Sequence, residues 1–419
     1  MRFSGPESPF RGRLAVPGDK SLSHRALFLA GMARGESRLR GLGPGADVRS
    51  TISILRRLGV HLEGERLASA GVADWADPGG PLDAGNSATT MRLLAGAVAA
   101  TGFTTTIVGD ASLSQRPMRR LVEPLATLGA AVVVSTAGTA PLVVTGAPLR
   151  GAEVDLPLPS AQIRTAVALA ALQAAGATMI SSPPGYRDHT ERWLEHLGLG
   201  ERRARGFAIF PGPVPPLDLT LPGDPSSAAF LWVAAAICPG ASVVTEEVSL
   251  NPGRVGVLDA LRAMGAAVTA TPTGEVMGDP VGEVRVAHRP LHGIHLDGMA
   301  TLRALDELPA IAVAAAHADG PTVVAGAAEL RVKETDRIET TVAMIRALGG
   351  QADPAADGFR VEPVALTGGR VDPAGDHRIA MAAAVAASAG APVDVEGFEI
   401  AAVSWPGFGA ALEALWSSR

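Results

Sequence analysis

A short pattern recurs along this chain and limits what the chain can fold into. The pattern is an aliphatic residue, two variable residues, Leu or Met, and then Gly, and its copies end at Gly59, Gly129, Gly198, Gly265 and Gly349. A sixth copy without the glycine, "LEALW", ends at Trp416. Neighbouring copies lie roughly 70 to 85 residues apart, and a recurring period is the mark of a repeat architecture. We therefore expect six similar units.

Each copy has the form of a helix end closed by a C′ glycine. A run of β-type residues follows most copies, such as "AAVVVST" after Gly129 and "AAVTATP" after Gly265. Because the period is too long for a solenoid repeat, the sequence predicts a small α/β module in each unit. A chance recurrence of a common helix end would not explain the regular spacing.

A longer similarity groups the six modules into two sets of three. "VPGDKSLSHRALFLAGMARGESRLRG" begins at Val16, and "LPGDPSSAAFLWVAAAICPGASVVTE" begins at Leu221. Both contain Pro-Gly-Asp before an Ala-rich helix, and Asp is a good N-cap. We therefore predict two lobes, residues 1–18 with 225–419 and residues 19–224, joined by hinges near Gly18–Asp19 and Gly223–Asp224.

Composition excludes several classes of function. Aromatic residues make up 4% of the 419 residues and the net charge is −6, which argues against a nucleic-acid surface. Cys238 is the one cysteine, so no intrachain disulfide and no Cys-rich metal site can form, and its apolar context predicts a buried, inert thiol. The first residues lack the apolar core of a signal peptide, and Ala228–Cys238 is too short to span a bilayer. We expect a cytoplasmic protein and, with no long apolar surface pattern, a monomer.

Polar residues gather at predicted helix starts. "GDKSLSHRAL" brings Lys20, Ser21 and Arg25 into one first turn, and "LPSAQIRTAV" does the same for Ser160 and Gln162. "GNSATTMRLL", "GDPSSAAF" and "GDHRIAMAA" are similar. One such start is an ordinary cap, but several together predict an anion-binding site, because helix N-termini present free N–H groups and a positive dipole end. A P-loop is excluded because Asp19, not Gly, precedes Lys20.

Only two of the 36 basic residues are lysines, Lys20 and Lys333. Lys333 lies in "ELRVKETDRIE" beside Glu334 and Arg337, and Asp306 precedes an apolar helix in "ALDELPAIAVAAA". A solvated helix start is the ordinary interpretation of such charges. The alternative is a carboxylate base facing cations. "HGIH" at 292–295 indicates a surface strand and not a metal site, since no fourth ligand accompanies it.

These segments resemble the 5-enolpyruvylshikimate-3-phosphate synthase family of enolpyruvyl transferases. The resemblance covers nearly the whole chain and rests on "PGDKSLSHR", "GNSATTMR", "GDASLSQRPM", "SAQIRTA", "RDHTER", "PGDPSSAAF", "LDELP", "ELRVKETDRI" and "DHRIAM", which occur in the family's order. It implies an α/β fold, the two-lobed inside-out barrel of six βαβαββ repeats. It also implies transfer of the carboxyvinyl group of phosphoenolpyruvate to the 5-hydroxyl of shikimate 3-phosphate, with release of phosphate and without metal or organic cofactor.

The resemblance also implies roles for individual residues. Lys20, Asp306 and Glu334 would be catalytic, with Asp306 the base for the hydroxyl, Glu334 the acid at C3 and Lys20 in contact with both substrates. The remaining shikimate 3-phosphate ligands would be Ser21, Arg25, Ser160, Ala161, Gln162, Arg187 and Lys333. The phosphoenolpyruvate ligands would be Lys20, Ala88, Arg116, Gln162, Arg337 and Arg378. Closure of the lobes would exclude water.

Two positions depart from much of the family. Ala88 stands where Gly is common, which is associated with tolerance to glyphosate, and Val403 stands where many relatives carry a lysine. Two rival interpretations remain. The related transferase acting on UDP-N-acetylglucosamine would need a cysteine on a mobile loop and an Asn after Lys20, where this chain has Ser21. A non-catalytic scaffold of repeated modules would not explain the two lysines or the charged helix starts.

Overall fold

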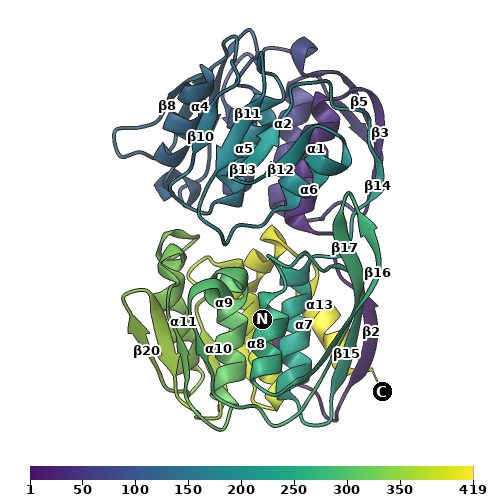
Figure 1. Cartoon of the computed structure of the whole chain (residues 1–419). Helices are drawn as coiled ribbons and strands as arrows, with labels where there is room; N and C mark the ends of the chain where they lie inside the picture. Colours follow the sequence, from purple (N-terminus) through teal and green to yellow (C-terminus); the bar gives the residue numbers. More distant parts are fainter. Residues whose placement is uncertain (419) are drawn as a thin grey trace. The chain divides into compact units, whose positions relative to one another are not determined.

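A computed structural model describes residues 1–418, and its chain divides into two compact units (Figure 1). Unit 1 consists of Met1–Pro17, Pro222–Gly274 and the chain from Pro280 onward. Unit 2 consists of Gly18–Leu221 and Glu275–Asp279. The lobes expected from the sequence had no interruption between 225 and 419, whereas in the structure the short segment 275–279 is part of unit 2.

The strands of residues 1–418 form six small sheets with one shared topology. In each sheet an entering strand runs parallel to a central strand, and the central strand pairs antiparallel with its other neighbour. In hydrogen-bonded order, the sheets of unit 2 are β14 (Asp218–Thr220), β3 (Arg34–Arg40), β5 (Arg66–Ala70) and β4 (His61–Glu63); β6 (Leu82–Asp83), β7 (Thr104–Val108), β9 (Leu142–Thr145) and β8 (Ala131–Val133); and β10 (Glu153–Asp155), β11 (Thr178–Ser181), β13 (Gly206–Ile209) and β12 (Gly200–Arg203). The other three, built mainly in unit 1, are β2 (Arg11–Ala15), β15 (Ser242–Ser249), β17 (Asp279–Ala287) and β16 (Ala267–Val276); β18 (His295–Leu296), β19 (Thr322–Val324), β21 (Gly358–Val361) and β20 (Ala352–Ala355); and β22 (Gly369–Val371), β23 (Val393–Val395) and β1 (Arg2–Phe3).

Three buried helices occupy the centre of each unit, with the sheets outside them. They are α1 (Lys20–Met32), α3 (Ala88–Ala97) and α5 (Ala161–Ala171) in unit 2, and α7 (Pro225–Ile237), α10 (Leu308–Ala316) and α12 (His377–Ala386) in unit 1. Every residue of α7, α10 and α12 is buried. Small residues allow this close packing: a Cβ at Gly96 of α3 would lie 1.9 Å from the carbonyl oxygen of Ala166 in α5. The predicted inside-out α/β fold is therefore confirmed.

More amphipathic helices accompany the central ones, and five of them end as the repeat pattern predicts. These helices are α2 (Ala46–Arg57), α4 (Val122–Leu128), α6 (His189–His196), α8 (Gly256–Ala263) and α11 (Arg337–Ala347). The glycines that follow them have left-handed φ angles between 69° and 109°, which only glycine adopts without strain. The sixth copy ends α13 (Phe408–Trp416), and α9 (Gly298–Arg303) is an additional short helix.

The tip of the β16–β17 hairpin belongs to unit 2 because Asp279 is buried there. Asp279 is 0% exposed, and its Oδ2 lies 2.8 Å from Nδ1 of His189 and 3.1 Å from Nε1 of Trp193, both in α6. Met277 packs against the apolar core of the same unit. A single carboxylate and a few apolar contacts therefore account for the interruption.

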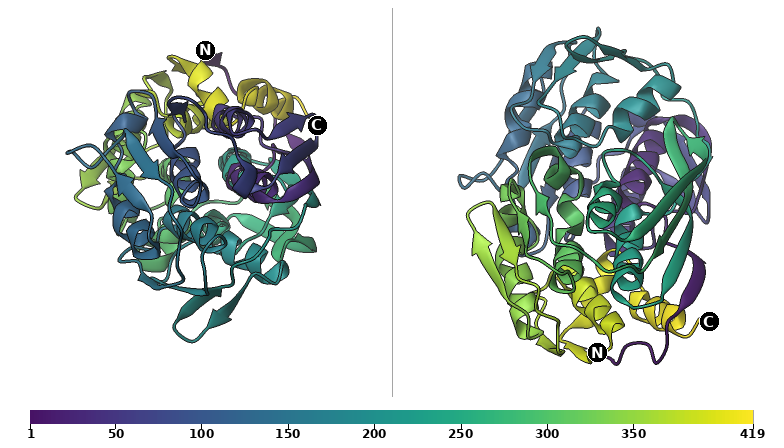
Figure 2. Two further views of the ribbon diagram at one scale, coloured as in Figure 1. Left: turned by 90° about the horizontal axis from the view of Figure 1, so that it is seen from above. Right: turned by 60° about the horizontal axis from the view of Figure 1, so that its bottom comes forward.

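Strands distant in sequence complete sheets in both units. β1 pairs with β23, and β2 pairs with β15, so the N-terminal strands belong to unit 1, near the C-terminal helix α13 (Figure 2). In unit 2, β14 runs parallel to β3 and completes its first sheet. Each unit therefore joins segments from opposite ends of its own sequence.

Candidate active site

Lys20 is the first residue of α1 and is paired with an acidic residue of α2. The N-cap Asp19 accepts a hydrogen bond from Leu22 N at 2.9 Å, which starts the helix at Lys20. The Lys20 ammonium lies 2.9 Å from Oδ2 of Asp47, and the two side chains are 18% and 9% exposed. A largely buried carboxylate thus fixes the position of this lysine.

Arg25 lies one turn further along α1 and is held by neutral oxygen atoms. Its Nη1 donates to the carbonyl of Ser21 at 2.9 Å, its Nε to Thr190 Oγ1 at 2.9 Å, and its Nη2 to Thr165 Oγ1 at 2.9 Å. The residue is 3% exposed. Arg25 therefore joins the start of α1 to α5 and α6.

The starts of α3 and α5 are joined by Gln162. Ser160 caps α5, which begins at Ala161, and Ser87 caps α3, which begins at Ala88. Gln162 donates from Nε2 to Thr89 Oγ1 at 2.8 Å and accepts a short hydrogen bond from Arg92. Three of the predicted ligands, Ala88, Ala161 and Gln162, therefore lie at adjoining helix starts.

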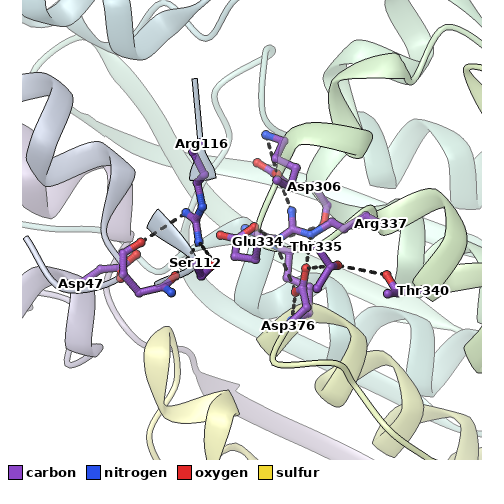
Figure 3. A network of polar contacts seen from close by, with 12 residues as sticks. Asp47, Ser112, Arg116, Asp306, Glu334, Thr335, Arg337, Thr340 and Asp376 are labelled. Carbon is purple, nitrogen blue, oxygen red and sulfur yellow. Dashed lines mark hydrogen bonds and ion pairs between the residues drawn. The ribbon is translucent and has the colours of Figure 1, made fainter. Parts of the chain in front are cut away.

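The two other predicted ligands of unit 2 lie in loops. Arg116 is 6% exposed and donates to both oxygens of Asn86, at 3.2 and 2.7 Å, and to Ser112 Oγ at 3.1 Å (Figure 3). Arg187 is half-buried in the loop that precedes α6. Arg116 is thus anchored beside the start of α3.

In unit 1, three carboxylates surround the guanidinium of Arg337, which is 1% exposed (Figure 3). Its Nε donates to Asp376 at 2.7 Å, its Nη1 to Asp306 at 3.2 Å, and its Nη2 makes a short hydrogen bond to Glu334. Asp336 caps α11 and Asp376 caps α12. Two of the three predicted catalytic residues, Asp306 and Glu334, therefore contact one arginine.

Asp306 has a second cation beside it. It lies in the short 3₁₀ turn η4 (Leu305–Glu307), and its Oδ1 is 3.4 Å from the ammonium of Lys333. Arg378, at the start of α12, donates to the Asp306 carbonyl at 2.9 Å. All five residues predicted in this half of the chain are consequently linked by printed contacts: Asp306, Lys333, Glu334, Arg337 and Arg378.

The charges of this cluster shift one another's ionisation. Burial by itself would lower the pKa of Arg337, but Asp376, Glu334 and Asp306 together raise it above its usual value. Burial would also raise the pKa of Asp376, but the positive charge of Arg337 outweighs burial and lowers that pKa. The guanidinium and this carboxylate therefore remain ionised together.

Two contacting residues were missed by the sequence reasoning. Asp47 pairs with Lys20, and Asp376 pairs with Arg337. Asp376 precedes the quoted "HRIA" segment directly, so a search for caps beside clustered arginines could have found it. Asp47 lies 27 residues from Lys20, and no local signal marks it as a partner.

The weaker candidates are explained by ordinary structure. His292 is exposed and its Nδ1 lies 2.8 Å from Asp319, while His295 begins strand β18. No group of three or more His, Cys, Asp or Glu that could hold a metal occurs in residues 1–418. Burial raises the pKa of the Cys238 thiol. Within the same residues, no helix has the length and apolar character needed to cross a bilayer.

Comparison with known proteins identifies close relatives over the full length of the chain. The model of the family described as "EPSP synthase (3-phosphoshikimate 1-carboxyvinyltransferase)" matches residues 5–412. A 3-phosphoshikimate 1-carboxyvinyltransferase of Halorhodospira halophila is 46% identical over 414 residues, which is 96% of this chain and 93% of the relative. One of Acidithiobacillus ferrooxidans is 45% identical over 412 residues, or 96% and 95% of the two chains.

Solved structures agree with the sequence relatives. An EPSP synthase from Acinetobacter baumannii superimposes with a TM-score of 0.86 at 37% identity, covering 99% of this chain and 98% of that one. The enolpyruvyl transferase NikO from Streptomyces tendae, at 19% identity and a TM-score of 0.74 over 99% and 96% of the chains, shares the fold. On the family match, the relatives and the shared fold, this chain belongs to the EPSP synthase family, the 3-phosphoshikimate 1-carboxyvinyltransferases.

Proposed function

We propose that the residues described above carry out the reaction of this family in the shikimate pathway. In that reaction the enolpyruvyl group of phosphoenolpyruvate moves to the 5-hydroxyl of shikimate 3-phosphate, and phosphate is released. The chemistry requires a base at the hydroxyl, an acid at the vinyl C3 and cations around the anionic groups of both substrates. No step assigned to a residue here uses a metal or an organic cofactor.

The position of Asp306 is the observation that carries the assignment of the base. Its carboxylate lies 3.4 Å from Lys333 and 3.2 Å from Arg337, and its side chain is 13% exposed. Adjacent cations favour the ionised form of a carboxylate, which is the form that accepts a proton. We assign Glu334, on the other side of Arg337, as the acid at C3, and Lys333 as a ligand of the shikimate hydroxyls.

The cations and helix starts are assigned to the substrates. Shikimate 3-phosphate is assigned to Ser21, Arg25, Ser160, Ala161, Gln162 and Arg187, together with Lys20, Asp306 and Lys333. Phosphoenolpyruvate is assigned to Ala88, Arg116, Arg337 and Arg378, together with Lys20 and Gln162. Free N–H groups at the starts of α3 and α5 support this assignment, because they attract anions. The residues come from one chain, and we propose that the protein acts as a cytoplasmic monomer.

The substitution Lys20→Arg tests the assignment. A planar guanidinium cannot take the place of a compact ammonium that contacts Asp47 and both substrates, so we expect a loss of kcat/KM of at least about 100-fold. Phosphate release from the two substrates measures it, and Arg56→Lys at the exposed end of α2 is the matched control. Near-normal turnover by Lys20→Arg enzyme would remove Lys20 from the proposed mechanism.

We also propose that Ala88 makes this protein weakly sensitive to glyphosate. Ala88 is the first residue of α3 and is 9% exposed, so its methyl group occupies space at a helix start assigned to phosphoenolpyruvate. Glyphosate is longer than phosphoenolpyruvate and would be crowded by that methyl group. We expect Ala88→Gly to lower the inhibition constant of glyphosate by about tenfold or more, since one methyl group in a pocket is worth roughly 1–3 kcal/mol. Equal, tight inhibition of both enzymes would contradict the proposal.

A further inference from the structure

A chain of buried hydrogen bonds joins the first three helices of unit 2. Nδ1 of His24 in α1 lies 2.8 Å from Oγ1 of Thr51 in α2, and that oxygen lies 2.7 Å from Oγ1 of Thr90 in α3. Thr90 in turn donates to Oγ of Ser87, the N-cap of α3, at 2.7 Å. His24, Thr51 and Thr90 are 0% exposed and Ser87 is 1% exposed. None of these four residues has a role in the mechanism above.

The direction of the chain follows from counting hydroxyl protons. Thr90 uses its single hydroxyl proton on Ser87 Oγ and, more weakly, on the Asp47 carbonyl at 3.3 Å. Thr51 must therefore be the donor in its bond with Thr90. Since Thr51 has then no proton left, His24 must donate to it from Nδ1–H. The bonds all run from His24 toward the start of α3, and aligned bonds of this kind strengthen one another.

The surroundings of His24 agree with this tautomer. Among the described residues, its Nε2 is buried and has no hydrogen-bond partner, as expected for the unprotonated nitrogen of a neutral ring. Burial lowers the pKa of His24 well below 6.5, and the charges of Lys20 and Arg25 lower it further. His24 therefore remains a neutral donor and has no proton to exchange.

The chain ends at helix starts that carry proposed phosphoenolpyruvate ligands. α2 carries Asp47, the partner of Lys20, and α3 begins at Ala88 with Thr89 bonded to Gln162. Arg25, by contrast, is held by hydroxyls of α5 and α6, which lie outside this chain. The chain thus fixes one group of proposed ligands more directly than the other.

We propose that His24 and Thr51 are positioning residues, which hold the start of α3 and the Lys20–Asp47 pair in register for phosphoenolpyruvate. The inference rests on the proposed function, because it assigns a task to the same site. It predicts that breaking the chain affects phosphoenolpyruvate more than shikimate 3-phosphate. It also predicts that any residue able to donate in place of Nδ1–H restores activity.

Two matched pairs of variants test the proposal. His24→Asn keeps an N–H donor near the position of Nδ1, whereas His24→Leu removes it. Thr51→Ser keeps the hydroxyl, whereas Thr51→Val keeps the shape and removes the hydroxyl. For His24→Leu and Thr51→Val we expect kcat/KM for phosphoenolpyruvate to fall by about 10- to 100-fold, through a higher KM as well as a lower kcat. KM for shikimate 3-phosphate should stay within about twofold, and the Asn and Ser variants should keep most of the activity.

A purely structural role gives a different result. If the substitutions only unfolded part of the sample, less active enzyme would be present, so kcat would fall while both KM values stayed unchanged. That result, or equal losses in Asn and Leu variants, would overturn the proposal, and so would full activity in Thr51→Val enzyme. Wild-type turnover in the same assay tests the proposed function separately, because inactive wild-type enzyme would contradict that function before any variant is compared.

Discussion

A buried guanidinium such as that of Arg337 is stable only when anions replace its lost hydration. Arg337 has three of them, and Asp376 is the least exposed, at 0% for its side chain. Asp376 also caps α12, through a hydrogen bond from Arg378 N at 2.9 Å. One carboxylate therefore holds a buried charge and starts the helix that carries Arg378.

We expect Asp376→Asn to lower the free energy of unfolding by about 3 kcal/mol, because it leaves part of a buried positive charge without its partner. Asp353→Asn is the matched control, since its pair with Arg346 is 75% and 53% exposed and should contribute less than about 1 kcal/mol. Urea denaturation at neutral pH measures both. Similar small losses in the two variants would show that Asp306 and Glu334 suffice for Arg337.

His24 makes stability depend on pH. Its pKa in the folded protein is well below 6.5, whereas in the unfolded chain it is near the ordinary value. Below about pH 6.5 the unfolded state binds a proton that the folded state does not, so stability is full above that pH and falls as the pH falls.

Comparison with His24→Asn isolates this effect, because His288 and His317, whose pKa values burial also lowers, are present in both proteins. Between about pH 6 and pH 5, wild-type protein should lose on the order of 1 kcal/mol more unfolding free energy than the variant. Urea titrations at a series of pH values measure the difference. A difference that stays constant from pH 8 to pH 5 would indicate that His24 takes up a proton in the folded state.

At the scale of elements, the helix ends were predictable because their signals are local. A left-handed glycine after α4, or an Asp cap before α1 and α7, is decided by a few neighbouring residues. The order of strands in the sheets is decided by contacts between distant segments, and the strand that pairs with β3 comes 178 residues later, from Arg40 to Asp218. Sequence periodicity predicted six modules but could not assign that partner.

The candidate site divides in the same way. Its helix starts and its two lysines were visible in the sequence, and the family resemblance supplied their roles. Asp47, Thr51 and Thr90 were not found, because a carboxylate or hydroxyl that pairs across helices has no distinctive neighbours in the sequence. Only the packing of α1, α2 and α3 brings these side chains together.

The β16–β17 hairpin gives a prediction about α6. Asp279→Ala leaves Trp193 Nε1 and the ring of His189 buried beside a missing acceptor. We expect amides of α6 to lose about 2–3 kcal/mol of protection in hydrogen exchange, roughly 30- to 150-fold in rate.

Glu283→Ala on the same strand is the control for that experiment. Glu283 pairs at the surface with Arg13, which is 56% exposed, so its removal should leave exchange in α6 unchanged. Faster exchange in both variants would mean that β17 as a whole, and not the buried carboxylate, stabilises α6.

At the scale of the whole molecule, both units depend on strands from distant parts of the chain. The amino group of Met1 donates to the carbonyl of Val395 at 2.7 Å across 394 residues, and β1 completes the sheet of β22 and β23. Unit 2 needs β14 for its first sheet and Asp279 for α6. Contacts between such distant residues are costly to form, which favours slow folding.

The pairing of β1 with β23 has a consequence during protein synthesis. At roughly 5–20 residues per second, β23 leaves the ribosome about 20 to 80 s after β1. Throughout that time β1 has no partner, and Phe3, which is fully buried in the finished protein, is exposed to the cytosol. An unpaired strand with an exposed aromatic residue is a site for aggregation and for chaperone binding. The first strand to be made is therefore among the last to reach its native place, and the nascent chain must be kept soluble until then.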